Sequence, residues 1–488
     1  MTPEELIDKL NEIQVMKSES KLLEIKAAKQ GCPKRLFDTL SSFSNQDDGG
    51  IIVFGVDEEN GFKECGVYDP QDIQKKINEQ CLQMEPIVRP LLTVAEKDGK
   101  YFVSAEIPGI DISERPCFYS GKGRLKGSYI RVGDSDEPMT EYEIYSFEAY
   151  RKNYQDDIRP VARATFSVLD SDYLKNYIYH LKEDKSNLSA LEDYMIYELV
   201  SITRNGEITL SSILLFCRYP QAFFPQLSII ALRVAGVTYA SADETGERFL
   251  DNRRIEGSIP EMLDQTIEFV KKNMRVKTII NPDTGKRDDR TEYPITAIRE
   301  TVLNTLVHRD YSIYTENKPI QVIMYNDRIE IQNPGGIYGR IRVDQLGKIQ
   351  PDTRNPVLAT ALETLRITEN RYSGIPAIRR SMAEWGLSEP VFADERGTFK
   401  VTLYNDYGTP EVKAGDGVAS RMEELLVFLN EPRSRKEITE FLGLTTTNYA
   451  MQTYIQPLLE SGKVRMTDPM NPRSHKQQFV RVKAIVVN

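Results

Sequence analysis

One stretch, Ile298 to Tyr311, constrains this chain more than any other part of it. It reads Ile-Arg-Glu-Thr-Val-Leu-Asn-Thr-Leu-Val-His-Arg-Asp-Tyr and places Glu300, Asn304 and His308 at i, i+4 and i+8. At that spacing the three side chains share one face of a helix, and the apolar residues between them can face a core. A carboxylate one turn before a carboxamide suits an ATP site, because the amide oxygen can bind Mg²⁺ and the carboxylate can deprotonate a water. The same spacing also fits an amphipathic helix whose polar side is simply hydrated.

The segments that follow favour the ATP site. The pattern predicts a hairpin, a glycine bend that lets backbone approach a ligand, a long polar loop, a second small-residue turn that opens a helix, and a last strand. In order, these are 319–325 with 328–332, Asn333 to Gly336, 337–354, Ser373 to Pro376 with the helix 377–385, and 397–404.

This order of segments resembles the GHKL ATPase fold, and more closely the divergent GHKL domain of a bacterial family of transcriptional regulators. The resemblance rests on Arg299-Glu300, Asn304, His308-Arg-Asp-Tyr, Asn333-Pro-Gly-Gly and Arg354-Asn-Pro. It implies that Glu300 is the general base of ATP hydrolysis, that Asn304 binds Mg²⁺, and that Asn333 replaces the aspartate that reads the adenine amino group. Tyr372 stands where the second turn usually has glycine, which predicts slow or absent hydrolysis. The remaining ATP-binding positions implied by the resemblance are His308, Gly335, Gly336, Arg354, Ser373 and Gly374.

Composition narrows the class of protein. A chain of 488 residues is expected to have more than one core, and 40% apolar with 28% charged residues is typical of soluble globular protein. No apolar run approaches the roughly 20 residues that cross a bilayer. The five cysteines are scattered without a C-x-x-C pair, which favours a reducing cytoplasm and no structural zinc. The three histidines exclude a His-rich metal site.

Residues near the N-terminus bring several carboxylates into neighbouring segments. Glu24 and Lys26 lie on one face of a predicted strand, Glu19 precedes it, and Asp57 ends the buried strand 51–56. Together they can form a hard-oxygen site for Mg²⁺ or Mn²⁺ beside a lysine, which suits activation of a water near a phosphodiester. Alternating Glu and Lys is also the pattern of a hydrated strand face.

The same region resembles the Schlafen AlbA domain. The resemblance rests on Glu24-Ile-Lys26, the following helix, Asn45, and Gly49 to Asp57 with its "Gly-Val-Asp" ending. In the RNA-cleaving Schlafen proteins, two glutamates five apart and a later aspartate are catalytic. Glu19, Glu24 and Asp57 match these positions, so the resemblance implies a candidate nuclease site. Many bacterial relatives have the same sequence motif without known cleavage activity.

Basic residues offer two candidate nucleic-acid surfaces. Lys122, Arg124, Lys126 and Arg131 can contact phosphates, or they form an ordinary basic loop. That loop is no Walker A sequence, and none occurs elsewhere, so a P-loop ATPase is excluded. From Arg433 to Asn488, nine basic residues stand against four acidic ones on a chain whose net charge is −10.

The C-terminal segment shows a winged helix-turn-helix pattern. Ser434 to Glu437 is a capping box, and three helices precede two strands at 463–466 and 477–487. Such a domain binds DNA or holds a protein partner. Its candidate DNA contacts are Thr446, Thr447, Asn448 and Gln452 on the third helix, with Arg473 and Lys476 on the wing.

We therefore predict a multidomain α+β chain. Residues 1–150 form a Schlafen AlbA-like α/β domain, 151–258 a connector, 259–406 a GHKL (Bergerat) α/β sandwich, 407–417 a linker and 418–488 the winged helix-turn-helix. This order implies a cytoplasmic, ATP-gated nucleic-acid-binding protein, a transcriptional regulator that acts as a homodimer on DNA or RNA, with weak ATPase activity. One alternative is a metal-dependent nuclease switched by ATP in defence or stress. The other is an ATP-binding scaffold for protein partners.

Overall fold

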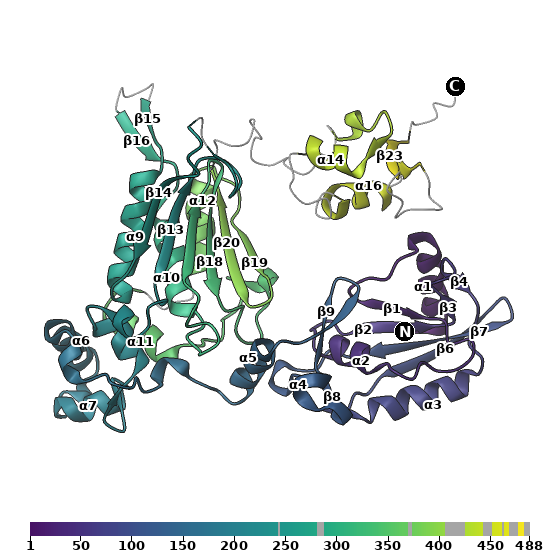
Figure 1. The fold of residues 1–488 in the computed structure, drawn as a ribbon, viewed down its shortest axis with the longest axis horizontal. Coiled ribbons are helices and arrows are strands. Elements are labelled where there is room, and N and C mark those ends of the chain that lie inside the picture. The colour runs from purple at the N-terminus through teal and green to yellow at the C-terminus, as the bar shows by residue number, and fades with distance from the viewer. Residues whose placement is uncertain are drawn as a thin grey trace. The chain divides into compact units, whose positions relative to one another are not determined.

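The computed structural model describes residues 1–242, 245–280, 287–368, 373–405, 425–442, 451–460, 463–467 and 477–482. The chain divides into two compact units. The first comprises residues 1–381 and 390–403, and it contains an N-terminal α/β domain, a helical segment and a second α/β domain (Figure 1). The second unit comprises residues 382–389 and 404–488. Within the described residues, no helix is long and apolar enough to cross a membrane.

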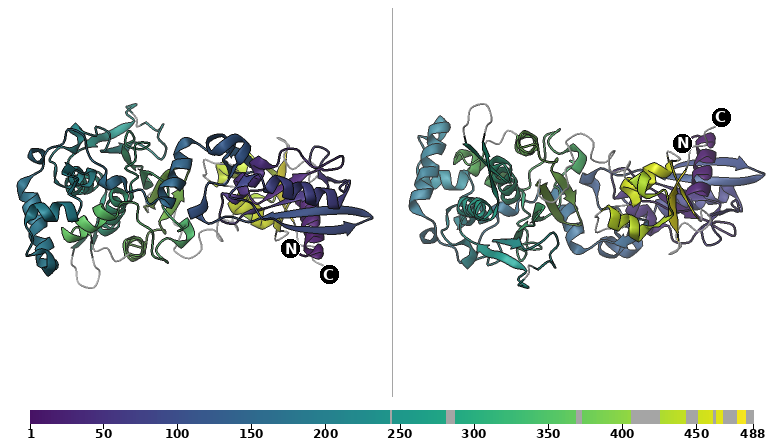
Figure 2. Two further views of the ribbon diagram at one scale, coloured as in Figure 1. Left: turned by 90° about the horizontal axis from the view of Figure 1, so that it is seen from below. Right: turned by 90° about the horizontal axis from the view of Figure 1, so that it is seen from above.

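The N-terminal domain is built on a four-stranded sheet with the order β1-β2-β7-β6. β1 and β2 are parallel, and the other neighbours are antiparallel. Apolar positions alternate along β2 and β7, so each face of the sheet has its own core, one covered by α1 and the other by α2 and α3. The hairpin of β6 and β7 projects beyond the rest of this domain in both views of Figure 2. The elements are α1 (Pro3–Met16), β1 (Leu23–Lys26), α2 (Phe37–Ser44), β2 (Gly50–Phe54), β3 (Val56–Asp57), β4 (Lys63–Glu64), α3 (Pro70–Cys81), β5 (Met84–Glu85), β6 (Leu91–Lys97), β7 (Lys100–Ile107), β8 (Phe118–Tyr119), α4 (Gly123–Gly127), β9 (Tyr129–Val132) and β10 (Ser135–Pro138).

A helical segment follows the N-terminal domain. It begins with α5 (Glu141–Arg151), which Thr140 caps through a capping box with Glu143. Asp157 attaches this segment to the second domain, since its buried carboxylate accepts hydrogen bonds from the first backbone amides of α11, 3.0 and 3.1 Å away. The other elements of the segment are α6 (Ser171–Asp184), α7 (Asp193–Leu199), β11 (Thr203–Arg204), β12 (Glu207–Ile208) and α8 (Leu210–Phe216).

The second α/β domain has a six-stranded sheet with the order β14-β13-β17-β18-β20-β19. β13 and β17 are parallel, whereas β14 runs antiparallel to β13 and β18 runs antiparallel to β17. Helices α9 and α10 pack against each other and against this sheet. Its elements are β13 (Ile229–Val234), β14 (Phe249–Ile255), α9 (Ile259–Asn273), β15 (Val276–Ile280), β16 (Arg287–Thr291), α10 (Ile295–His308), β17 (Ile320–Met324), β18 (Arg328–Pro334), α11 (Pro356–Thr364), α12 (Gly374–Glu384), β19 (Val391–Asp394) and β20 (Thr398–Tyr404).

The boundary of this domain differs from the predicted one. β13 and β14 lie within residues 151–258, which we expected to be only a connector, yet they supply one edge of the sheet. The pairing of β13 with β17 joins segments almost a hundred residues apart. Periodicity along the chain does not reveal such long-range pairing.

The second unit contains a small core around Leu425, Leu429, Ile438 and Phe479. The capping box predicted at its second helix is present, with the Ser434 amide donating to the Glu437 carboxylate over 2.8 Å. The described elements are a helical turn at 425–428, β21 (Arg433–Ser434), α14 (Arg435–Phe441), a π-helical turn (Met451–Ile455), α16 (Gln456–Glu460), β22 (Val464–Met466) and β23 (Gln478–Arg481), with the sheet order β21-β23-β22.

Candidate functional site

Helix α10 brings Glu300, Asn304 and His308 to one cavity. The helix begins after Pro294, and its apolar side, which includes Ile298 and Val302, is fully buried. Burial of that side leaves the polar side facing the cavity. The three residues therefore form one polar wall of the cavity, as their spacing in the sequence predicts.

The cavity has a volume of about 610 Å³ and lies between α10, β18, β20, α12 and the segment 337–354, which we call the lid. The glycine turn at Gly335 and Gly336 forms one rim, and the turn at Ser373 and Gly374 forms another. The lid contributes a mostly apolar wall that the sequence analysis did not predict, namely Ile337, Tyr338, Ile341, Leu346 and Ile349. Tyr372 lies outside the described residues.

Two asparagines of the cavity wall each have one buried side-chain amide atom with no hydrogen-bond partner in the described part of the chain. Among the described residues, neither Oδ1 of Asn333 nor Nδ2 of Asn304 has a hydrogen-bond partner. Leaving such a group unsatisfied costs about 1–3 kcal/mol, so sites of this kind usually complete their hydrogen bonds with a ligand or water. The amide oxygen of Asn333 fits the exocyclic amino group of adenine. The Asn304 amide, whose oxygen and nitrogen can be exchanged by a flip, fits a metal-bound phosphate.

The glycines of both rims are required by close approach. A Cβ on Gly335, whose φ is +106°, would lie 2.6 Å from the Cβ of Asp310. A Cβ on Gly374 would lie 2.7 Å from Nδ2 of Asn304. Glycine therefore lets both turns approach the polar wall of α10 and leaves backbone amides near the space for a ligand.

Arg354 stabilises the Gly335–Gly336 turn from the side that faces away from the cavity. Its guanidinium forms an ion pair of 2.6 Å with Asp310, donates to the carbonyl of Gly336 over 3.2 Å, and lies over the ring of Tyr338. The side chains of Arg354 and Asp310 are only 6% and 4% exposed. Arg354 is not among the residues that line the cavity, so its place is behind the glycine turn rather than against a ligand.

Positive charge reaches the cavity from residues other than Arg354. The His308 side chain is exposed to the cavity, and the reduced hydration there, followed by the Arg354 guanidinium, lowers its pKa to about 4, so the imidazole is neutral at pH 7. Arg299 and Arg366 also line the cavity, and sequence analysis did not single them out as ligand contacts. Arg299 donates to the carbonyl of Ile367 over 2.8 Å and lies 3.7 Å from the Glu300 carboxylate. Within the described part of the chain, these two arginines line the cavity as cations that can contact a phosphate chain.

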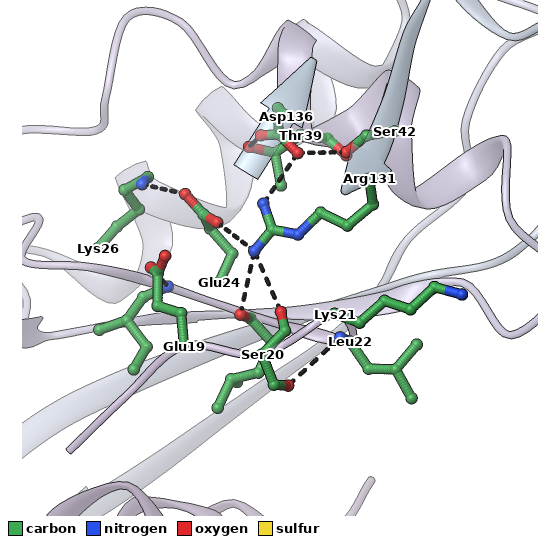
Figure 3. A network of polar contacts seen from close by, with 12 residues as sticks. Glu19, Ser20, Lys21, Leu22, Glu24, Lys26, Thr39, Ser42, Arg131 and Asp136 are labelled. Carbon is green, nitrogen blue, oxygen red and sulfur yellow. Dashed lines mark hydrogen bonds and ion pairs between the residues drawn. The ribbon is translucent and has the colours of Figure 1, made fainter. Parts of the chain in front are cut away.

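Two of the four candidate nuclease residues, Glu24 and Lys26, form a network with Arg131 (Figure 3). One carboxylate oxygen of Glu24 pairs with Lys26, and the other lies 2.9 Å from the Arg131 guanidinium. Arg131 also pairs with Asp136 over 2.9 Å, and its side chain is 1% exposed. Asp136 in turn accepts hydrogen bonds from the hydroxyls of Thr39 and Ser42.

This arrangement does not fit a divalent metal. Both oxygens of Glu24 face cations, and Asp57 is occupied in a turn where it accepts from the Asn60 side chain over 2.7 Å. Glu19 faces Glu24 instead and accepts from the Ile25 amide over 2.7 Å. Among the residues that the structure describes, no group of three His, Cys, Asp or Glu side chains could hold a metal. We therefore derive no metal-dependent cleavage step for this site.

Glu19 gives the N-terminal domain a pH dependence. Burial, and next the charge of Glu24, raise the pKa of Glu19 to about 7 from 4.5. The unfolded chain loses this proton near pH 4.5 but the folded chain keeps it to about pH 7, so stability falls as the pH rises between these values. Glu19→Gln should reduce that slope and raise the melting temperature of the N-terminal domain at pH 8 by roughly 2–4 °C. Thermal unfolding of the full chain from pH 4.5 to 8 measures this, with the exposed Glu96→Gln as control. Equal slopes for the two variants would contradict it.

The candidate nucleic-acid contacts divide into three groups. Arg131 is buried and paired, so our prediction that it contacts phosphates is wrong. Arg124 pairs with Glu148, and Lys122 donates to the Tyr129 hydroxyl over 3.0 Å but stays exposed, as does Lys126. Of the C-terminal candidates, Thr446, Thr447, Asn448, Arg473, Lys476 and the side chain of Gln452 lie outside the described residues.

Comparisons with known proteins identify two domains of this chain. Residues 317–403 match the family model described as putative ATP-dependent DNA helicase recG C-terminal. The cavity thus belongs to an ATPase-like domain of a multidomain, mixed α/β protein. Residues 19–140 match the Schlafen, AlbA_2 family model, so the N-terminal domain is a Schlafen AlbA_2 domain. Both family resemblances predicted from the sequence are confirmed.

The other comparisons are less specific. Residues 420–480 match the C-terminal domain of Fic-like proteins (filamentation induced by cAMP), so the winged helix stays a prediction. Among solved structures, the DIP2311 protein from Corynebacterium diphtheriae is 16% identical over 98% of this chain and 97% of that chain, with a TM-score of 0.40. The N-terminal domain of a putative ATP-dependent DNA helicase RecG-related protein from Nitrosomonas europaea is 27% identical over 29% of this chain and 94% of that chain, with a TM-score of 0.23. The comparison with curated proteins gives no match.

Proposed function

We propose that this chain binds ATP with Mg²⁺ in the cavity and uses the nucleotide to control the binding of nucleic acid. The observation that carries the proposal is the polar wall of the cavity. There, Asn333 and Asn304 present buried, unpartnered amide atoms between two glycine turns, within the described residues. In this scheme Asn333 reads the adenine ring, Asn304 holds Mg²⁺, and Glu300 orients the attacking water. Bound ATP with Mg²⁺ would supply the phosphate chain that completes these contacts.

The nucleic-acid part of the proposal rests on domain composition and charge. A Schlafen AlbA_2 domain is joined to a domain related to a DNA helicase C-terminal family, and exposed Lys122 and Lys126 offer phosphate contacts. Regulation of transcription, DNA rather than RNA as the target, and a homodimer as the working unit are predictions from the family resemblance.

Titration of ATP and Mg²⁺ into the full chain tests the nucleotide site. Asn333→Ala should weaken ATP binding by about five- to thirtyfold, because it removes one buried hydrogen bond worth about 1–2 kcal/mol. The matched control is Asn252→Ala, the same truncation at an exposed position of β14. Equal affinities of the two variants, or no binding by the wild type, would overturn the assignment of the cavity.

Mobility shifts on duplex DNA, single-stranded DNA and RNA, with and without ATP, test the second half of the proposal. We expect an ATP-dependent affinity that falls steeply with salt, because phosphate contacts release counterions. A salt-independent complex, or no complex, would favour a scaffold for protein partners. Loss of intact nucleic acid in the presence of Mn²⁺ would favour a nuclease instead.

A further inference from the structure

Helix α5 connects the N-terminal domain to the ATPase-like domain through a row of tyrosines. It begins three residues after β10 ends and reaches the second domain with its side chains. Three tyrosine hydroxyls of this helix each donate to an aspartate: Tyr142 to Asp310 over 2.8 Å, Tyr145 to Asp156 over 2.6 Å, and Tyr150 to Asp352 over 3.1 Å. The helix is thus fixed at several points along its length.

The first turn of α5 is linked to the Gly335–Gly336 turn through Asp310 and Arg354. Tyr142 donates to Asp310, the same carboxylate that holds Arg354 under Gly336. The Tyr142 ring also packs on backbone, since a Cβ on Gly397 would lie 2.4 Å from it. A displacement of the glycine turn therefore reaches Tyr142 through a single buried ion pair.

The last turn of α5 contacts the lid directly. Tyr150 donates to Asp352, and its ring meets the ring of Tyr338 edge-on with the centroids 5.4 Å apart. Both Asp352 and Tyr338 line the cavity. A lid that closes on a ligand must move these two residues, so the contact with Tyr150 has to break or α5 has to follow.

The N-terminal end of α5 is connected by ion pairs to β10, which carries Asp136 of the Arg131 network. Arg396, in the turn between β19 and β20, bridges Glu143 of the helix over 3.1 Å and Glu137 of β10 over 2.7 Å. The neighbouring residue, Asp136, holds Arg131 and through it Glu24 (Figure 3). Contacts are thus continuous from the cavity wall to the interior of the Schlafen AlbA_2 domain.

We propose that α5 is the relay through which closure of the lid on ATP changes the nucleic-acid affinity of the N-terminal domain. This inference rests on the proposed function and names its physical route. A ligand shifts such a coupled element only by its preference for one arrangement, and the effect is reciprocal between the two sites. Nucleic acid should therefore tighten or weaken ATP binding by the same factor by which ATP changes nucleic-acid binding.

Tyr150→Phe in the full chain tests the relay. It removes one hydroxyl that touches the lid, whereas Tyr145→Phe makes the same change on the same helix at a hydroxyl that bonds Asp156 outside the cavity wall. The quantity measured is the coupling factor, the ratio of the nucleic-acid dissociation constants without and with ATP. We expect Tyr150→Phe to bind ATP within about threefold of wild type but to lose about fivefold in this factor, the value of one hydrogen bond. Tyr145→Phe should keep the factor.

The outcomes separate the relay from the proposed function. An unchanged coupling factor in Tyr150→Phe, or an equal loss in Tyr145→Phe, would overturn the relay while ATP gating stands. A wild-type chain that does not bind ATP would overturn the proposed function and the relay with it. Hydrogen exchange gives an independent reading, because ATP should change the protection of the amides of α5 in the wild type. Unchanged protection with ATP bound would overturn the relay.

Discussion

Arg354→Ala should destabilise the ATPase-like domain by about 3–5 kcal/mol, the cost expected when one partner of a buried ion pair is removed. Asp310, whose side chain is 4% exposed, would lose its cationic partner, and the carbonyl of Gly336 would lose its donor. The Gly335–Gly336 turn should loosen as a result, so ATP affinity should fall although Arg354 does not line the cavity. Hydrogen exchange of the amides of α10 and β18 measures the local free energy of unfolding.

The control for this prediction is Arg340→Ala, another arginine of the lid. Arg340 pairs with Asp111 over 3.3 Å, and its side chain is 63% exposed. Exposed pairs of this kind contribute about 0–1 kcal/mol. If Arg354→Ala costs no more than Arg340→Ala, the buried pair does not support the cavity and the role we assign to it is wrong.

Local patterns predicted the polar wall of the cavity well. The spacing of Glu300, Asn304 and His308 alone specifies one face of a helix. The turns at Gly335 and Gly374 approach neighbouring atoms so closely that only glycine fits there, and the glycines are visible in the sequence. The hairpin of β17 and β18 and the capping box at Ser434 were also predicted, because each depends on residues only a few positions apart.

Features that depend on distant partners were not predicted. Arg131 lies two positions after the buried Tyr129 on β9 and so shares its face of the strand, which means that the inward direction of Arg131 could have been predicted from the strand period. The nearby Lys122 and Lys126 suggested a phosphate contact instead. The sequence around Arg131 does not show that Arg131 forms ion pairs with Glu24 and Asp136 in the folded domain. The same limit explains the missed strand β14 and the row of tyrosines on α5.

Some of the missed elements did have a local signal. Helix α3 buries Ile73, Ile77 and Cys81 at i, i+4 and i+8, which is a helical spacing visible in the sequence. Asp69 caps it, with Pro70 at its first position. This helix covers one face of the N-terminal sheet and contributes no residue to the cavity, so its sequence signal is one of packing and not of chemistry.

Glu300→Gln should keep ATP binding and lose ATP turnover, by about 10²–10⁴-fold if Glu300 is the general base. Glutamine preserves the volume and a hydrogen-bonding oxygen beside Asn304 in the cavity wall but cannot take a proton from water. Binding is measured by titration and turnover by phosphate release. The matched control is Glu330→Gln on β18, whose carboxylate pairs with Arg328 over 2.7 Å and does not line the cavity. Loss of ATP binding in Glu300→Gln would make Glu300 a binding group rather than a base. Equal turnover in the variant and the wild type would place the base elsewhere in the cavity and leave Glu300 as part of its polar wall.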